Sequence, residues 1–216
     1  MKLLIFGPPG SGKGTTAKLY ADAVGLTHIS SGDMFRREIA AGTLLGKNVS
    51  KLLQTGALVD DATTSNLVFH QLEGQDDFIL DGFPRTLRQA TDLLSQISIN
   101  GVISIELSDD KIIHRISQRR VCPRDGSSYH LLFKPPKVDG KCDRCSAKLI
   151  QREDDTPSVV KSRLSMYRET TAPALDFLRS QNIPCITIQG DYDLKSEWPS
   201  IIRRLRAWQR VVESQL

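Results

Sequence analysis

The stretch "LLIFGPPGSGKGTT", residues 3–16, joins an apolar run to a glycine-rich turn. A buried strand that leads through such a turn into a helix presents several backbone N–H groups to one anion. Common phosphate-binding loops place a hydroxyl directly after the lysine, where it reaches magnesium. In this chain Gly14 follows Lys13, and two threonines come after it. The stretch predicts a nucleotide phosphate site, with the metal held by phosphate oxygens and water; a tight strand-to-helix turn without a ligand is the alternative.

Short apolar runs alternate with amphipathic stretches along the chain. The expected strands are 2–6, 27–30, 77–80, 101–107 and 184–189. The expected helices around them are 14–24, 61–73, 86–97, 109–118, 157–181 and 195–214. This alternation predicts an α/β fold with a parallel five-stranded sheet flanked by helices.

Two segments interrupt the alternation. Residues 31–59 hold two further expected helices, 33–41 and 43–54, whereas residues 119–156 are rich in Gly, Pro, Cys and charge. We therefore expect a helical insertion and a small, β-rich insertion on a common core. The predicted core comprises 1–30, 60–118 and 157–216.

The composition indicates a globular protein with one main domain. The chain has 216 residues, of which 39% are hydrophobic and 25% charged. No apolar run approaches the roughly 20 residues that span a bilayer, and the apolar start "MKLLIFGPPG" is too short for a signal peptide. A cytoplasmic location without a membrane partner is expected. The net charge of +4 is weak evidence for nucleic acid, and no such partner is expected.

The segment "DFILDGFPRT", residues 77–86, places an acid at the end of an expected buried strand. Ligands bind at the carboxyl ends of strands in open α/β sheets. Asp81 is therefore a candidate to bind the waters around magnesium, and Arg85 to clamp a phosphate with two hydrogen bonds.

Three of the four cysteines lie within residues 122–145. Two residues lie between Cys122 and Asp125, and two between Cys142 and Cys145; sixteen residues separate the two pairs. This is the spacing of a four-ligand zinc site with one cysteine replaced by aspartate, and carboxylate oxygen is an acceptable zinc ligand. A structural Zn²⁺ is predicted, with reduced, metal-free cysteines as the alternative.

Several further motifs occur in order along the chain. They are "SSGDMFR" (30–36), "TGALV" (55–59), "DGFPRT" (81–86), "RRVC" (119–122) followed by "YH" (129–130), and "QREDD" (151–155). Together with the loop at 7–16 they resemble the long-lid adenylate kinases, nucleoside monophosphate kinases of the P-loop class. The resemblance implies reversible transfer of the terminal phosphoryl group of ATP to AMP, giving two ADP, with Mg²⁺. It further implies a role in adenine nucleotide homeostasis, a monomer, and 31–59 and 119–156 as the AMP-binding and lid subdomains.

The resemblance also implies roles for particular residues. ATP would contact Gly10, Ser11, Gly12, Lys13, Gly14, Thr15, Arg119, Ser128, Tyr129 and Tyr192. AMP would contact Ser31, Arg36, Ala57, Leu58, Val59, Gly82, Phe83, Pro84, Arg85, Gln89, Arg152 and Arg163. The groups acting on the transferring phosphoryl would be Lys13, Arg85, Arg119, Arg152 and Arg163, with Asp33 and Asp81 around magnesium. This chain differs from the family pattern at two positions: Ser31 stands where threonine is usual, and Tyr192 where lysine is usual.

Water competes with AMP as acceptor, so 31–59 and 119–156 are expected to close over both substrates. Two other enzymatic activities keep the same fold: a GTP-dependent AMP kinase and a pyrimidine monophosphate kinase. The long lid and Gln89 argue against the pyrimidine form. A nucleic-acid-binding zinc ribbon on a P-loop scaffold is the non-enzymatic alternative, weakened by the few aromatics in 119–156.

Overall fold

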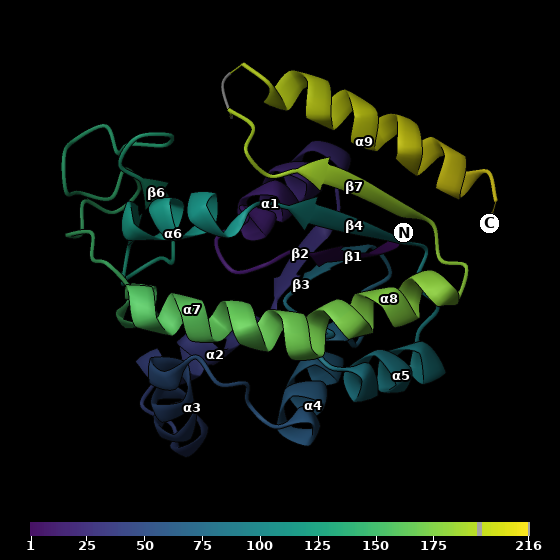
Figure 1. Ribbon diagram of the computed structural model, residues 1–216, viewed down its shortest axis with the longest axis horizontal. Helices are drawn as coiled ribbons and strands as arrows, with labels where there is room; N and C mark the ends of the chain where they lie inside the picture. Colours follow the sequence, from purple (N-terminus) through teal and green to yellow (C-terminus); the bar gives the residue numbers. More distant parts are fainter. Residues whose placement is uncertain (194–195, 216) are drawn as a thin grey trace.

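A computed structural model describes residues 1–193 and 196–215 (Figure 1). Within these residues a five-stranded, all-parallel sheet has the order β2-β3-β1-β4-β7. Its strands are β1 (Lys2–Phe6), β2 (Thr27–Ser30), β3 (Phe78–Asp81), β4 (Gly101–Glu106) and β7 (Cys185–Gln189). The predicted α/β fold with a parallel five-stranded sheet is confirmed.

The helices follow the predicted positions to within a few residues. They are α1 (Lys13–Val24), α2 (Ser31–Ala40), α3 (Leu44–Thr55), α4 (Asp61–Leu72), α5 (Leu87–Gln96), α6 (Asp109–Ser117), α7 (Pro157–Met166), α8 (Ala172–Ser180) and α9 (Trp198–Glu213). The predicted start of the last helix, residue 195, lies outside the described residues, and α9 begins at Trp198. No helix in the described part of the chain is long and apolar enough to cross a membrane.

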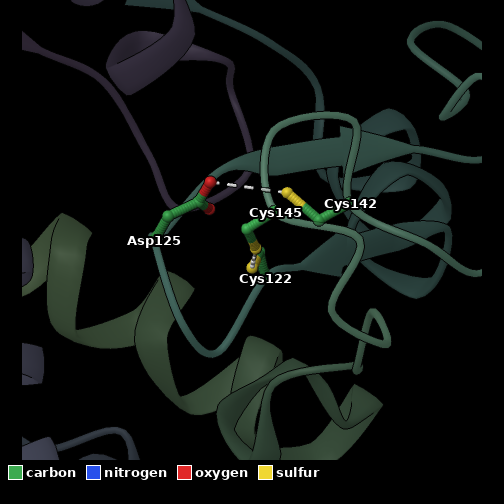
Figure 2. Close-up of side chains that lie close together, drawn as sticks. All are labelled: Cys122, Asp125, Cys142 and Cys145. Atoms are coloured by element: carbon green, nitrogen blue, oxygen red, sulfur yellow. Dashed lines mark hydrogen bonds between the residues drawn. The ribbon is translucent and has the colours of Figure 1, made fainter.

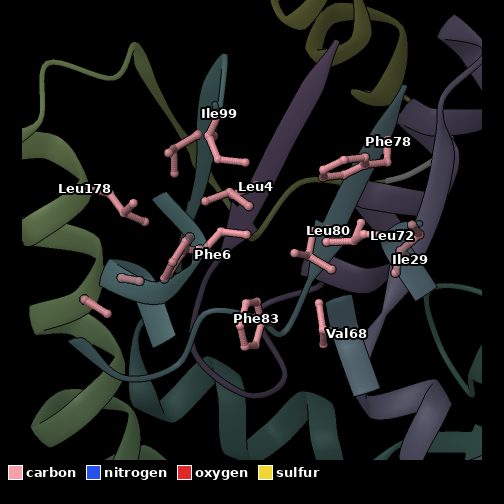
Figure 3. Close-up of a cluster of buried hydrophobic side chains, with 14 of the residues drawn as sticks. Leu4, Phe6, Ile29, Val68, Leu72, Phe78, Leu80, Phe83, Ile99 and Leu178 are labelled. Carbon is pink, nitrogen blue, oxygen red and sulfur yellow. The ribbon is translucent and has the colours of Figure 1, made fainter. Parts of the chain in front are cut away.

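The side chains of the central strand β1 pack into two separate cores, one on each face of the sheet. Successive side chains of a strand point to opposite faces. Leu4 and Phe6 pack in one core with residues of α4, α5 and α8 (Figure 3), whereas Leu3 and Ile5 pack in a second core with α1 and α9. Because both faces of β1 are covered, the strand is apolar and buried from Leu3 to Phe6, as expected for a buried parallel sheet.

The segment predicted as one helix over 157–181 is a helix with a change of winding in its middle. α7 and α8 are joined by a π-helical turn, Tyr167–Thr171. π-helical turns are rare and occur often at functional sites. This one borders the cleft described below.

The two segments expected as insertions, 31–59 and 119–156, contain helices and short strands of their own. α2 and α3 pack against each other closely, since a Cβ at Gly46 would lie 2.2 Å from the Glu38 carbonyl oxygen. Residues 119–156 contain the antiparallel strands β5 (Arg119–Val121) and β6 (Ser128–His130), and a short 3-10 turn, Glu153–Asp155. Turns and isolated bridges make up most of the rest of this segment, which Figure 1 shows beside α6 and the start of α7.

Candidate active site

A cleft opens at the carboxyl ends of β1 and β3. It is lined by residues of the phosphate loop, of α2 and α3, of the turn after β3, and of α7 with its π-helical turn. Most residues expected to bind AMP lie there: Ser31, Arg36, Ala57, Leu58, Val59, Gly82, Pro84, Arg85, Gln89 and Arg163, together with Lys13 from the ATP set. Phe83 differs, because its side chain is packed in the core against Phe69, which leaves only its backbone for a ligand.

The phosphate loop has the backbone that its glycines predict. Gly10 and Gly12 have φ of 79° and 93°, in the left-handed region where glycine is the residue without steric cost. Gly12 precedes the first residue of α1, Lys13, so the helix N-terminus points its free N–H groups into the loop. Ser11 is fully buried, and its hydroxyl has no hydrogen-bond partner among the described residues. This arrangement is suited to an anion.

Gly14 stands where other phosphate loops carry a hydroxyl, and the structure gives a steric reason for it. A Cβ at this position would lie 3.0 Å from Oδ2 of Asp81. The Asp81 carboxylate also lies 3.7 Å from His28 Nε2, and its Oδ1 is buried without a hydrogen bond in the described chain. Burial opposes ionisation of Asp81, but His28 and the positive charge of Lys13 hold its pKa below the usual value.

Four cationic side chains line the cleft, and two more, which do not line it, lie close enough to interact with them. The first four are Lys13, Arg36, Arg85 and Arg163, and the other two are Arg119 and Arg152. Desolvation, followed by nearby positive charges, lowers the pKa of Lys13 to about 8 although Asp81 opposes this shift. Desolvation and the charges of Arg119 and Arg36 lower the pKa of Arg152 to about 9. Burial is the largest cause of both shifts, and the nearby positive charges add to it; buried, crowded cations of this kind mark functional sites.

Two acids at the base of the lid hold two of these arginines. Nε of Arg119 donates to Oδ2 of Asp155 at 2.8 Å, and a second guanidinium nitrogen pairs with Oδ1. Arg163 donates to Oδ2 of Asp154 at 2.7 Å. The Asp155 side chain is fully buried. Arg152, by contrast, has a buried Nε without a partner in the described residues, so it is available to an anion.

The turn after β3 connects the cleft to α2. Ser31 donates its hydroxyl hydrogen to the Gly82 carbonyl at 2.7 Å, and Arg85 Nε donates to the same oxygen at 2.7 Å. Serine thus supplies the hydroxyl that threonine supplies in the usual pattern. Asp33 pairs with Arg36 one helical turn away and does not line the cleft.

Two of the residues expected beside ATP, Tyr129 and Tyr192, have other side-chain partners in this structure. The Tyr129 hydroxyl lies 3.4 Å from Cys142 Sγ and accepts a hydrogen bond from the Asp143 N–H at 2.8 Å. The Tyr192 hydroxyl lies 2.6 Å from Thr16 Oγ1, and its ring stacks on Trp198. Tyr192 thus links α9 to α1. Ser128 lies on β6 and is half-buried.

The four residues predicted to bind zinc are brought together (Figure 2). Their ligand atoms all lie within 4.8 Å of one another. The Sγ atoms of Cys122 and Cys145 are 3.4 Å apart, as are Cys142 Sγ and Asp125 Oδ2. In a tetrahedral zinc site with bonds of about 2.3 Å, sulfur ligands lie about 3.8 Å apart. The donor set and its spacing therefore fit a metal ion.

Comparison with known proteins agrees with this architecture. Residues 5–183 match the family described as adenylate kinase. An adenylate kinase of Petrotoga mobilis is 42% identical over 215 residues, covering 97% of this chain and 100% of the relative. An adenylate kinase of Kosmotoga olearia is 43% identical over 213 residues, covering 95% of this chain and 99% of the relative. One of Pyrococcus furiosus is 42% identical over 207 residues, covering 93% of this chain and 94% of the relative.

The chain belongs to the adenylate kinase family. Members of this family are ATP:AMP phosphotransferases, and the agreement over nearly the full length assigns this activity to the chain. The family membership that the motifs predicted is confirmed.

The structure of this adenylate kinase adds residues that the motifs did not single out. The Arg115 guanidinium lies over the Phe133 ring at 5.3 Å and donates to the Gly190 carbonyl. Arg115 lies in the last turn of α6, whereas Arg119 begins β5, so no helical spacing relates the two and no motif marked Arg115. Thr171, in the π-helical turn, donates to the Arg85 carbonyl at 3.0 Å, a contact between distant segments that no sequence pattern indicates.

Proposed function

We propose that this adenylate kinase binds AMP in the cleft and the ATP phosphates on the loop from Gly10 to Thr15, and transfers the terminal phosphoryl group between them. One observation carries the assignment of roles. Six cations from separate segments line the cleft or lie close to it, against the four carboxylates of Asp33, Asp81, Asp154 and Asp155. This excess of positive charge at the carboxyl ends of the sheet matches a pair of phosphate-bearing substrates.

The reaction needs positioning and charge more than covalent catalysis. A phosphate oxygen of AMP attacks the terminal phosphorus of ATP, and the bond from that phosphorus to the bridging oxygen breaks, leaving ADP on each side. Negative charge spreads over the transferring group, so fixed cations stabilise the transition state. We assign Lys13, Arg85, Arg119, Arg152 and Arg163 to that group, and Arg36, together with Arg85, to the AMP phosphate.

Mg²⁺, when bound with ATP, neutralises phosphate charge. The chain offers Asp81 to it: Oδ2 of this side chain faces Gly14 of the phosphate loop, and its Oδ1 is buried without a hydrogen-bond partner among the described residues. This oxygen is placed to accept hydrogen bonds from metal-bound waters. Asp33, which pairs with Arg36, is proposed as a second acid near those waters.

We assign the cysteine cluster to a structural Zn²⁺. Burial raises the pKa of the Cys122 thiol, and the Ser127 N–H, which donates to Asp125 at 2.9 Å, lowers the pKa of that carboxyl to about 2. Asp125 is therefore ionised at neutral pH, ready to act as a ligand. Four protein ligands leave no open position, so the metal would stabilise the lid and take no part in phosphoryl transfer.

Residues 31–59 and 119–156 are proposed to move as the AMP-binding subdomain and the lid. Some of the hydrogen bonds that join these segments to their neighbours are exposed, such as Gln54 with Glu153 at 3.2 Å and the Thr55 carbonyl with Ser162 at 3.1 Å. Exposed hydrogen bonds exchange readily with water, which favours a change of position on ligand binding. Identical positions with and without a bisubstrate inhibitor would contradict this.

We infer that ATP, AMP and ADP are its partners, that it acts as a monomer in the cytoplasm, and that nucleic acid and membranes are not involved. The test mixes protein, Mg²⁺, ATP and AMP and measures ADP, beside a Lys13→Ala control. No ADP above that control would refute the proposed roles. Exchanging ATP for GTP, and AMP for UMP or CMP, separates the alternative donors and acceptors.

A further inference from the structure

The carboxamide of Gln89 is held at both of its ends before any ligand binds. Its Oε1 accepts from the Arg85 backbone N–H at 2.8 Å, and its Nε2 donates to Oδ1 of Asp61 at 2.9 Å. Gln89 is 1% exposed and lines the cleft. The Thr86 hydroxyl donates to the same Asp61 oxygen at 3.0 Å, which fixes the carboxylate in turn.

These two partners determine which way the amide faces. A carboxylate oxygen only accepts hydrogen bonds, and a backbone N–H only donates. Rotating the Gln89 amide by 180° would set its NH₂ against the Arg85 N–H and its oxygen against Asp61, so both contacts would become repulsive. The orientation that is often ambiguous for glutamine is therefore fixed here by its neighbours.

The fixed amide has one N–H and one oxygen lone pair left for a ligand. Gln89 carries the one carboxamide among the described residues that line the cleft. A 6-aminopurine presents an N–H donor next to a ring-nitrogen acceptor, whereas a 6-oxopurine presents an acceptor next to an N–H donor. The two bases therefore require opposite orientations of the amide, and a site discriminates by leaving the wrong base unpaired.

We propose that Asp61 is a specificity-determining positioning residue, which selects a 6-aminopurine over a 6-oxopurine acceptor by orienting Gln89. Asp61 acts through Gln89 and does not line the cleft. The proposal rests on the proposed binding of AMP in this cleft. It goes further by naming the group that sets the base preference, on a helix separate from Gln89.

The test compares kcat/KM for AMP and IMP, which differ at purine C6 and in the proton on N1, with ATP as donor. In Asp61→Ala the AMP-to-IMP ratio is expected to fall roughly tenfold to hundredfold, the effect of losing a hydrogen bond to a charged group. The loss should appear mainly in KM for AMP. Asp61→Asn keeps an acceptor oxygen and should restore the ratio to within a few-fold of wild type.

Asp60→Ala is the matched control. Asp60 caps α4 by accepting from the Thr63 N–H at 2.9 Å, and no hydrogen bond in the described part of the chain joins its side chain to Gln89. Its replacement removes a neighbouring acid and should leave the ratio unchanged. A ratio that stays at the wild-type value in Asp61→Ala would overturn the proposal.

Wild-type protein that forms no ADP from AMP would refute the proposed function instead, so the two failures are distinct. If Asp61→Ala does not fold, ¹⁵N-labelled wild-type protein gives a second measurement. The side-chain amide protons of Gln89 should exchange slowly with solvent, because the group is bonded at both ends. Fast exchange would contradict a fixed amide.

Discussion

The Tyr129 hydroxyl lies 3.4 Å from Sγ of Cys142, so a residue matched by sequence to the ATP site contacts the cluster of candidate metal ligands. The side chain is buried, and the Asp143 N–H donates to the same hydroxyl. A hydroxyl that accepts from a backbone N–H has its own hydrogen free for the sulfur. Tyr129 is thus placed to orient a metal ligand, as outer-shell groups do in other metal sites.

Replacing Tyr129 with phenylalanine is expected to weaken zinc binding about tenfold, the lower end of the effect of losing an outer-shell partner. Competition with a chromogenic chelator measures the affinity. The KM for ATP should change little, because the hydroxyl points to the cluster. A large rise in that KM with zinc affinity unchanged would show instead that Tyr129 acts on ATP.

Removal of zinc is expected to lower thermal stability while leaving the chemistry largely intact. Protein purified without chelator should hold one zinc ion per chain by elemental analysis, and Cys142→Ser should lose it. The Tm should fall, since a ligand that binds only the folded lid stabilises it. Cys185→Ser, on β7, is the matched control and should retain the metal. Metal-free wild-type protein would argue for the reduced, unmetallated alternative.

Nucleotide binding is expected to take up a proton above pH 8. The pKa of Lys13 is lowered to about 8, so the free protein loses this charge as pH rises through 8. A bound phosphate favours the charged form and raises that pKa. Affinity for ATP should therefore fall above pH 8, by up to about tenfold per pH unit. Calorimetry in two buffers of different ionisation enthalpy measures the uptake, and Lys13→Met should abolish it.

Asp155→Asn is expected to destabilise the fold by about 3–5 kcal/mol, because it leaves the partly buried Arg119 without its counter-charge. For a chain of this size the Tm should fall by roughly 6–20 °C. Glu153→Gln, an exposed acid in the same short turn, is the control and should cost little. Equal thermal stability of the two variants would show that the Arg119–Asp155 pair contributes little to folding.

Gly46→Ala is expected to destabilise residues 31–59. The added Cβ would lie 2.2 Å from the Glu38 carbonyl oxygen, and a backbone atom cannot move aside as a flexible side chain can. Overpacking costs about 1–3 kcal/mol, which exceeds the helix-propensity gain of about 1 kcal/mol from alanine. Urea unfolding and the KM for AMP should both report the change, whereas Lys47→Ala, at the next and exposed position, should be close to neutral. A variant as stable as wild type would mean that α2 and α3 separate without cost.

The sequence by itself determined the backbone of the phosphate loop, the strands and the helices. The glycines at 10 and 12 adopt the left-handed conformation that their residue type allows, and the apolar runs became the five parallel strands. These features depend on a few neighbouring residues, so local propensity and periodicity predict them. The cluster of candidate metal ligands was also found from spacing, because tight turns bring each pair together locally.

Only the tertiary structure decided the contacts between distant segments. Asp81 reaches Gly14 because β3 pairs with β1, Asp61 reaches Gln89 because α4 packs beside α5, and Tyr129 turns toward Cys142 inside the lid. Each contact joins residues 13 to 67 positions apart. No local pattern encodes such a distance or the direction of a side chain, because both follow from how the whole core packs. The motifs therefore located the site, while the packing determined which groups fix its geometry.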